Sequence, residues 1–161
     1  MADRWVVNAS PVILLAKAEI IRFLPQLCDE LVIPSGVVEE VQQLHENDAG
    51  AVWLRGDGAR FVRSTAASHP ALKGWRGGAG EGEVISWALC HPGFIAILDD
   101  RRARTFAVQN GVPVLGSLRI IVLAKERGLI TNARTALEKL RGEGAWVSDD
   151  LIRKAVELAG E

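Results

Sequence analysis

Acidic residues occur at three separate points of the chain where a metal-dependent reaction could use them: Glu40, Glu81 and the pair Asp99-Asp100. Carboxylate oxygens are ligands that Mg²⁺ and Mn²⁺ prefer, and these ions keep several waters when only a few carboxylates bind them. Such an ion can orient a water for attack on a phosphodiester and neutralise charge in the transition state. The three points therefore indicate metal-dependent phosphodiesterase chemistry, provided that the fold brings them together.

The place of Glu40 on its helix favours such a role. In the helical pattern that follows residue 34, Val37 and Val41 lie on one apolar stripe. At about 100° per residue, Glu40 lies about 60° from Val37, at the edge of that stripe, while Glu39 faces solvent. We expect Glu40 to lean over the edge of a sheet.

Glu81 is placed by the same geometry on the face of a helix that is to be buried. That face is defined by Val84, Ile85, Ala88 and Leu89. Glu81 falls near its middle, and Glu83 points almost opposite. A buried carboxylate costs several kcal/mol without a partner, and the helix dipole returns only about 0.3–1 kcal/mol in the first turn. A metal ion explains Glu81 better.

Simpler roles exist for each of these acids. Glu81 can reach back as a capping carboxylate, Glu40 can be a solvated residue, and Asp99-Asp100 can be an N-cap with a first-turn acid. The metal hypothesis rests on their combination.

The elements that must position these residues alternate along the chain. Apolar runs predict strands at 5–7, 31–33, 60–63, 94–98 and 112–115. Ser10-Pro11 predicts a helix start with Ser10 as N-cap, and Pro34-Ser35 predicts the next. Further helices are expected at 80–90, after 100, and at 118–127, 131–141 and 149–159, and a loop at 64–80.

Alternating strands and helices predict a three-layer α/β/α fold around a mostly parallel sheet of four to five strands, in one domain over 1–161. Open sheets of this kind bind ligands beyond the carboxyl ends of their strands. The residues to inspect are therefore Asn8, those from Pro34 onward, and Asp99-Asp100.

Composition sets limits on function. Hydrophobic residues make up 48% and charged residues 24%, which is typical of a globular protein. Lys+Arg number 19 and Asp+Glu 20, which argues against a broad basic surface along duplex DNA but is compatible with a short, local contact to a phosphate backbone. Cys28 and Cys90 show no metal-like spacing. We expect no signal peptide, no membrane span and a cytoplasmic location.

Four motifs in order resemble the PIN-domain family, in particular a VapC-related, toxin-like branch found beside toxin–antitoxin genes in bacteria and archaea. They are Val6-Val7-Asn8-Ala9-Ser10-Pro11, Ile33-Pro34-Ser35-Gly36-Val37-Val38-Glu39-Glu40, Gly80-Glu81-Gly82-Glu83 and Leu98-Asp99-Asp100-Arg101-Arg102-Ala103-Arg104. Gly116-Ser117 and the segment 124–130 are also similar to that branch. The resemblance covers nearly the whole chain.

This resemblance implies an Mg²⁺- or Mn²⁺-dependent ribonuclease, in many members the toxin of a toxin–antitoxin pair. Carried over by position, the family's first acid falls on Asn8 with Ser10 beside it, the second on Glu40, the third on Glu81 and the fourth on Asp99 or Asp100. Asn8 departs from the usual aspartate. Its amide oxygen can coordinate a metal but brings no charge, so the affinity for Mg²⁺ should fall.

The remaining candidates concern binding. Arg101, Arg102 and Arg104 can hold a nucleic-acid backbone beside the metal, although a solvated helix face explains them equally. The tryptophans are expected to pack in the core or at interfaces, and Trp75, in a Gly-rich loop, is the one with a possible contact role.

The implied partners are RNA, a cognate antitoxin and a second copy of the chain, because small parallel-sheet domains with nearly all-apolar helices often form homodimers. The main rival is a PIN-fold binding or regulatory module without turnover, which Asn8 favours. A receiver-like or phosphatase domain is a weaker rival, because Asn8 lacks acyl-phosphate chemistry.

Overall fold

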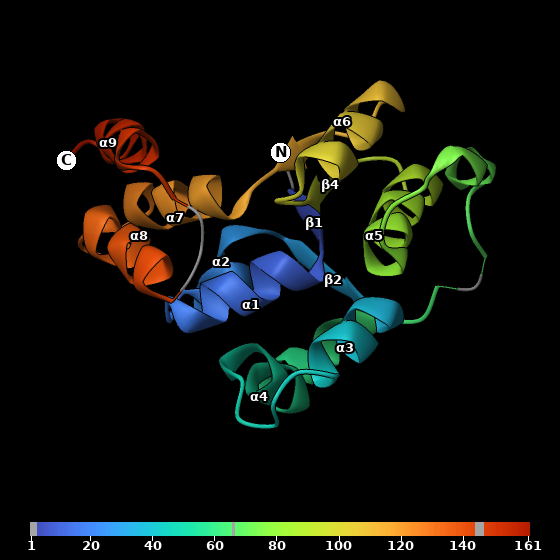
Figure 1. The fold of residues 1–161 in the computed structure, drawn as a ribbon, viewed down its shortest axis with the longest axis horizontal. Coiled ribbons are helices and arrows are strands. Elements are labelled where there is room, and N and C mark those ends of the chain that lie inside the picture. The colour runs from blue at the N-terminus through green and yellow to red at the C-terminus, as the bar shows by residue number, and fades with distance from the viewer. Residues whose placement is uncertain (1–2, 66, 144–146) are drawn as a thin grey trace.

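The computed structural model describes residues 3–65, 67–143 and 147–161 (Figure 1). Trp146, one of the tryptophans expected to pack, lies outside these residues. None of the helices in these ranges is long and apolar enough to cross a lipid bilayer.

Five parallel strands form the central sheet. They are β1 (Arg4–Val7), β2 (Glu30–Pro34), β3 (Val62–Arg63), β4 (Phe94–Ile97) and β5 (Val114–Leu115), in the order β3-β2-β1-β4-β5. In the register of the centre, Trp5 lies beside Leu31 on one side and Ile95 on the other. The predicted α/β/α class with a parallel sheet is therefore confirmed.

Helices connect the strands and continue beyond the last one. They are α1 (Ala9–Lys17), α2 (Leu24–Leu27), α3 (Ser35–Gln42), α4 (Ala49–Arg55), α5 (Ala79–Cys90), α6 (Arg101–Gln109), α7 (Ser117–Glu126), α8 (Ala133–Gly142) and α9 (Asp149–Leu158). Short 3₁₀ turns lie at Ile21–Phe23, Asp57–Phe61 and Pro70–Gly74.

The strand order places these helices in two layers. From β1 the chain moves outward through β2 to β3, then crosses to β4 and moves the other way to β5. Right-handed crossovers put α1, α3 and α4 on one face and α5 and α6 on the other. In Figure 1, α7, α8 and α9 pack together at the side away from α5, and α7 and α8 also contact α1. The direction reverses between β1 and β4, so ligands are expected there.

The core is apolar on both sides of the sheet. Within β1 and β4, Trp5, Val6, Val7, Ala96 and Ile97 are all buried. Strands buried on both faces need such continuous apolar runs. In α7, Ile120, Ile121, Val122 and Ala124 are buried.

Several local predictions need correction. Helix α1 begins at Ala9, so Asn8 occupies the N-cap position and Ser10, predicted as the cap, lies inside the first turn. The strand expected over 60–63 covers only Val62–Arg63, because the preceding residues form a 3₁₀ turn.

Two further elements were not expected. Helix α4 is started by Asp48, whose carboxylate accepts from the backbone of Gly50 and Ala51. The segment predicted as a loop over 64–80 contains the 3₁₀ turn Pro70–Gly74 and the first residues of α5.

Candidate functional site

The site lies where the carboxyl ends of β1 and β4 meet. Asn8 follows β1 directly, and Asp99 stands two residues beyond β4. The backbone NH of Asn8 donates to the carbonyl of Ile97 at 3.2 Å, which ties the two strand ends together. The reversal in strand order therefore brings polar side chains from the two halves of the fold to one crevice, as in other open sheets that bind ligands.

Asn8 is the buried polar group of this crevice. The residue is only 4% exposed, and its side-chain oxygen Oδ1 finds no hydrogen-bond donor among the described residues. An unpaired buried polar atom costs about 1–3 kcal/mol, so such atoms in folded proteins usually have a ligand, ion or water as partner. Asn8 Oδ1 is therefore a buried hydrogen-bond acceptor without a partner among the described residues, and it is free to coordinate a ligand.

The space left open by the missing side chain of Gly80 is bordered by both Glu40 and Asn8. A β-carbon at position 80 would lie 2.5 Å from Glu40 Oε2 and 3.5 Å from Asn8 Oδ1. The carboxylate from α3 and the amide from the end of β1 thus share the space beside the first turn of α5. Glycine at this position leaves that space open. Glu40 is exposed, so its carboxylate reaches in from the solvent side.

Glu81 lies in the first turn of α5, partly buried. Burial is the main cause that raises its pKa above the ordinary 4.5, and the negative charges of Asp100 and Glu40 raise it further. A backbone hydrogen bond from Gly78 and the charge of Arg102 act in the opposite direction. The negative charges of Asp100 and Glu40 therefore both act on Glu81, which is the electrostatic setting that a cation relieves.

Asp99 and Asp100 have different partners. Asp99 accepts from the backbone NH and the hydroxyl of Ser117, at 2.8 and 2.7 Å, and from the hydroxyl of Ser10 at 3.3 Å. Asp99 thus caps the start of α7 from outside the helix. Asp100 is the N-cap of α6, where its Oδ2 accepts from Ala103 at 2.9 Å.

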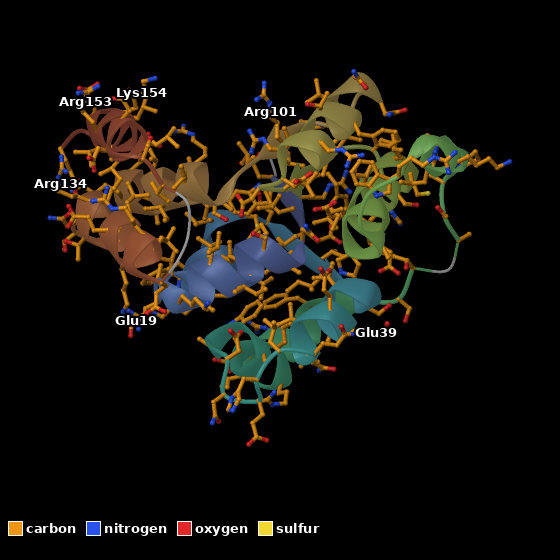
Figure 2. The ribbon with its side chains drawn as sticks, viewed as in Figure 1. Glu19, Glu39, Arg101, Arg134, Arg153 and Lys154 are labelled. Carbon is orange, nitrogen blue, oxygen red and sulfur yellow. The ribbon has the colours of Figure 1, made fainter. Side chains whose placement is uncertain are left out.

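The three arginines after these acids separate into two groups. Arg101 and Arg102 are exposed on α6 and line a surface groove with Trp75 and Arg76. Figure 2 shows Arg101 pointing away from the body of the protein. Arg104 turns inward, and its guanidinium donates to the carbonyl of Leu98 at 3.0 Å. The structure does not bring Arg104 into the groove.

Two residues at this edge were not singled out from the sequence. Ser117, 2% exposed, is the first residue of α7 and donates to Asp99, and its only sequence signal was its place in the Gly116-Ser117 pair. Glu83 accepts from the backbone NH of Gly36 at 2.9 Å and so holds the start of α3, the helix that carries Glu40. Nothing local predicts this contact, because it requires α5 to pack against α3.

The donor set fits a hard divalent cation. Within residues 3–65, 67–143 and 147–161, no three His, Cys, Asp or Glu side chains converge into a complete metal-binding cluster. Mg²⁺ does not need one, because it is commonly held by one or two carboxylates and keeps several waters. The unpaired oxygen of Asn8, the carboxylate of Glu40 beside it and the crowded carboxylate of Glu81 provide oxygen donors of this type.

Comparison with known proteins gives one match. A family model described as a PIN domain matches residues 4–161, almost the whole chain. No curated protein and no solved structure matches.

Proposed function

The chain belongs to the PIN-domain family, a nuclease-type fold, and on this basis we propose that it cleaves RNA with the help of Mg²⁺ or Mn²⁺. One observation carries the proposal: the buried, unpaired Oδ1 of Asn8 lies beside the carboxylate of Glu40 at the point where the strand order reverses.

The polar side chains of the proposed site have two parts. Asn8, Glu40, Glu81 and Asp100 would hold the ion, and the bound ion would supply an activated water and charge neutralisation at the phosphate. Asp99, whose oxygens accept three hydrogen bonds, fixes Ser10 and the first turn of α7 as one wall of the site. Of the two adjacent aspartates, the proposal therefore makes Asp100, the N-cap of α6, the metal ligand, and gives Asp99 a supporting part.

The remaining residues of the chain keep this arrangement in place. Burial of Asn8 shields its amide oxygen from bulk water. Glu83 fixes the start of α3 and therefore the position of Glu40, which lies one turn further along the same helix. Arg101 and Arg102 place positive charge next to Asp100, where they bind the phosphates of the substrate.

Asn8 favours a second function, an RNA-binding or regulatory module without turnover. An amide carries no charge, so the site holds one negative charge fewer than an aspartate at this position would give. If this function holds, Mn²⁺ fails to bind at millimolar concentration in a calorimetric titration, and RNA stays intact with either metal.

RNA cleavage in Mg²⁺ or Mn²⁺ tests the proposal. Glu40→Ala and Glu81→Ala should each lower the cleavage rate at least a hundredfold. Glu39→Ala is the matched control, because Glu39 sits on the same helix and points outward from it (Figure 2). Equal rates in Glu81→Ala and the unaltered protein contradict the site, whereas a loss in Glu39→Ala points to damage of α3.

We further propose that the nuclease acts as a cytoplasmic toxin, paired with an antitoxin and assembled as a homodimer. Family membership supports only the nuclease-type fold, and the resemblance of the four sequence motifs to the toxin-like branch is what suggests the toxin and its antitoxin. Co-expression with the product of an adjacent small reading frame should abolish the cleavage measured above. Light scattering of the purified chain should give the mass of two copies, and the mass of one copy contradicts the dimer.

A further inference from the structure

We propose that the groove between the Trp75 loop and α6 is a subsite for one unpaired base of single-stranded RNA together with its flanking phosphates. This inference rests on the proposed function, because it names the form of RNA that the acidic site receives. The groove encloses about 350 Å³ and is lined by Trp75, Arg76, Arg101, Arg102, Phe106 and Gln109. That volume lies at the small end of ligand sites, which suits a group the size of a nucleoside.

The aromatic wall of the groove is held in place. The indole NH of Trp75 donates to the carbonyl of Gly78 at 2.9 Å, and its ring lies 5.1 Å from that of Phe106. A β-carbon at Gly77 would overlap the ring of Trp75, and one at Gly82 would lie 3.2 Å from it. The two glycines therefore leave room for the indole against the backbone. A fixed aromatic ring can stack an unpaired base at little cost in conformational entropy.

Positive charge is concentrated in the same groove. The chain as a whole carries a net charge of -1, yet Arg76, Arg101 and Arg102 line this one hollow, and all three are exposed. Guanidinium groups bind phosphate through paired hydrogen bonds and also stack on bases. The combination of an aromatic wall and three guanidinium groups is the chemistry of single-stranded nucleic-acid binding.

The groove opens next to the acidic site. Gly78 lies between the two, because its carbonyl accepts from the indole NH of Trp75 and Glu81 follows three residues later in the first turn of α5. Arg101 and Arg102 follow Asp100 directly, and the charge of Arg102 acts on Glu81. A base on Trp75 would therefore place the adjoining phosphates beside Glu81 and Asp100. Bases in a duplex are stacked on one another, so only an unpaired base can use this wall.

Binding without metal tests the subsite separately from cleavage. The probe is a fluorescein-labelled RNA strand of ten nucleotides in EDTA, read by anisotropy, and compared with its blunt duplex and with an abasic ribose-phosphate strand of the same length. We expect the single strand to bind at least tenfold more tightly than either. Equal binding of the duplex or of the abasic strand overturns the proposal.

Variants of Trp75 test stacking. Trp75→Ala should weaken binding of the RNA strand about tenfold, the scale of one stacked base, and leave the abasic strand unchanged. Trp75→Phe should stay within threefold of the unaltered protein, whereas Trp75→Leu, which keeps bulk but no aromatic face, should lose as much as alanine. This pair remains informative if the alanine variant fails to fold. Equal affinities in the phenylalanine and leucine variants overturn stacking.

Salt dependence tests the phosphate contacts. Arg76→Ala and Arg102→Ala should each reduce the slope of log affinity against log salt by about 0.7. Arg134→Ala is the matched control, since Figure 2 shows Arg134 on α8, far from Arg101. Unchanged slopes in both groove variants overturn the phosphate contacts.

The two proposals fail in different ways. Glu81→Gln should abolish cleavage, while binding in EDTA stays at least as tight because the variant removes a negative charge beside the phosphates. RNA that binds through Trp75 but is never cleaved contradicts the proposed function alone. If Trp75→Ala binds RNA with the same affinity as the unaltered protein and cleaves it at the same rate, the subsite alone is contradicted.

Discussion

Substitution of Gly80 by alanine separates metal binding from folding at the candidate site. The new β-carbon would lie 2.5 Å from Glu40 Oε2 and 3.5 Å from Asn8 Oδ1, between the two proposed ligands. The end of the Glu40 side chain is flexible and exposed, so it can withdraw without disturbing the core. Alanine is also favoured over glycine within a helix by about 0.5–1 kcal/mol. We expect the metal-free variant to be as stable as the unaltered protein, or slightly more stable.

The affinity for the metal should fall. Disturbing the surroundings of a ligand typically costs about 10- to 100-fold in metal affinity. At a Mn²⁺ concentration of 100 times the dissociation constant, binding adds about 2.7 kcal/mol to the unfolding free energy, and a tenfold weaker site adds about 1.4 kcal/mol. For a chain of this size, 1 kcal/mol shifts the melting temperature by about 2–4 °C. The Mn²⁺-induced rise should therefore drop to about half in Gly80→Ala.

The assay is thermal melting with EDTA and with Mn²⁺, supported by calorimetric titration. Gly142→Ala is the control, because it also replaces a helical glycine and no described atom lies within 4 Å of its new β-carbon. An equal Mn²⁺-induced rise in Gly80→Ala and Gly142→Ala would refute the placement of the metal between Asn8 and Glu40. A large loss of metal-free stability in Gly80→Ala would refute the flexible withdrawal of Glu40.

Three further predictions concern the apo protein. Burial and the neighbouring carboxylates raise the pKa of Glu81 in the folded state, so above pH 4.5 the folded protein binds more protons than the unfolded chain and its stability falls as the pH rises. Urea unfolding in EDTA should show a smaller fall in stability for Glu81→Gln than for the unaltered protein. An equal fall in both contradicts the assignment. Asp99→Ala should lower the unfolding free energy by about 2–4 kcal/mol, because it leaves the buried Ser117 without its carboxylate partner, and a loss under 1 kcal/mol in denaturant titration contradicts this. Burial raises the pKa of the Cys28 thiol to about 12, while Cys90 is exposed, so iodoacetamide should modify one thiol of the native protein at pH 8, identified by mass spectrometry as Cys90, and rapid labelling of both contradicts the burial.

Much of the fold could be predicted from the sequence, for local reasons. Central strands buried on both faces require continuous apolar runs, which is why β1, β2 and β4 were found within a residue or so of their observed bounds. The edge strand β3 was less certain, because two residues that pair on one side only need no distinctive pattern. Helix α4 was missed, since its Asp48 cap resembles an ordinary turn residue until the helix packs against α1.

The sequence by itself determined which residues have oxygen ligands to offer and at which strand ends they stand. The spacing along α3 and α5 selected Glu40 and Glu81, because helical periodicity is a local property. Tertiary structure alone decided how they meet: that Asn8 Oδ1 is left unpaired beside Glu40, that Asp99 is held by Ser117 while the charge of Asp100 acts on Glu81, and that Trp75 joins the arginines of α6. These contacts join residues far apart in the chain, and their geometry follows from the packing of helices on the sheet.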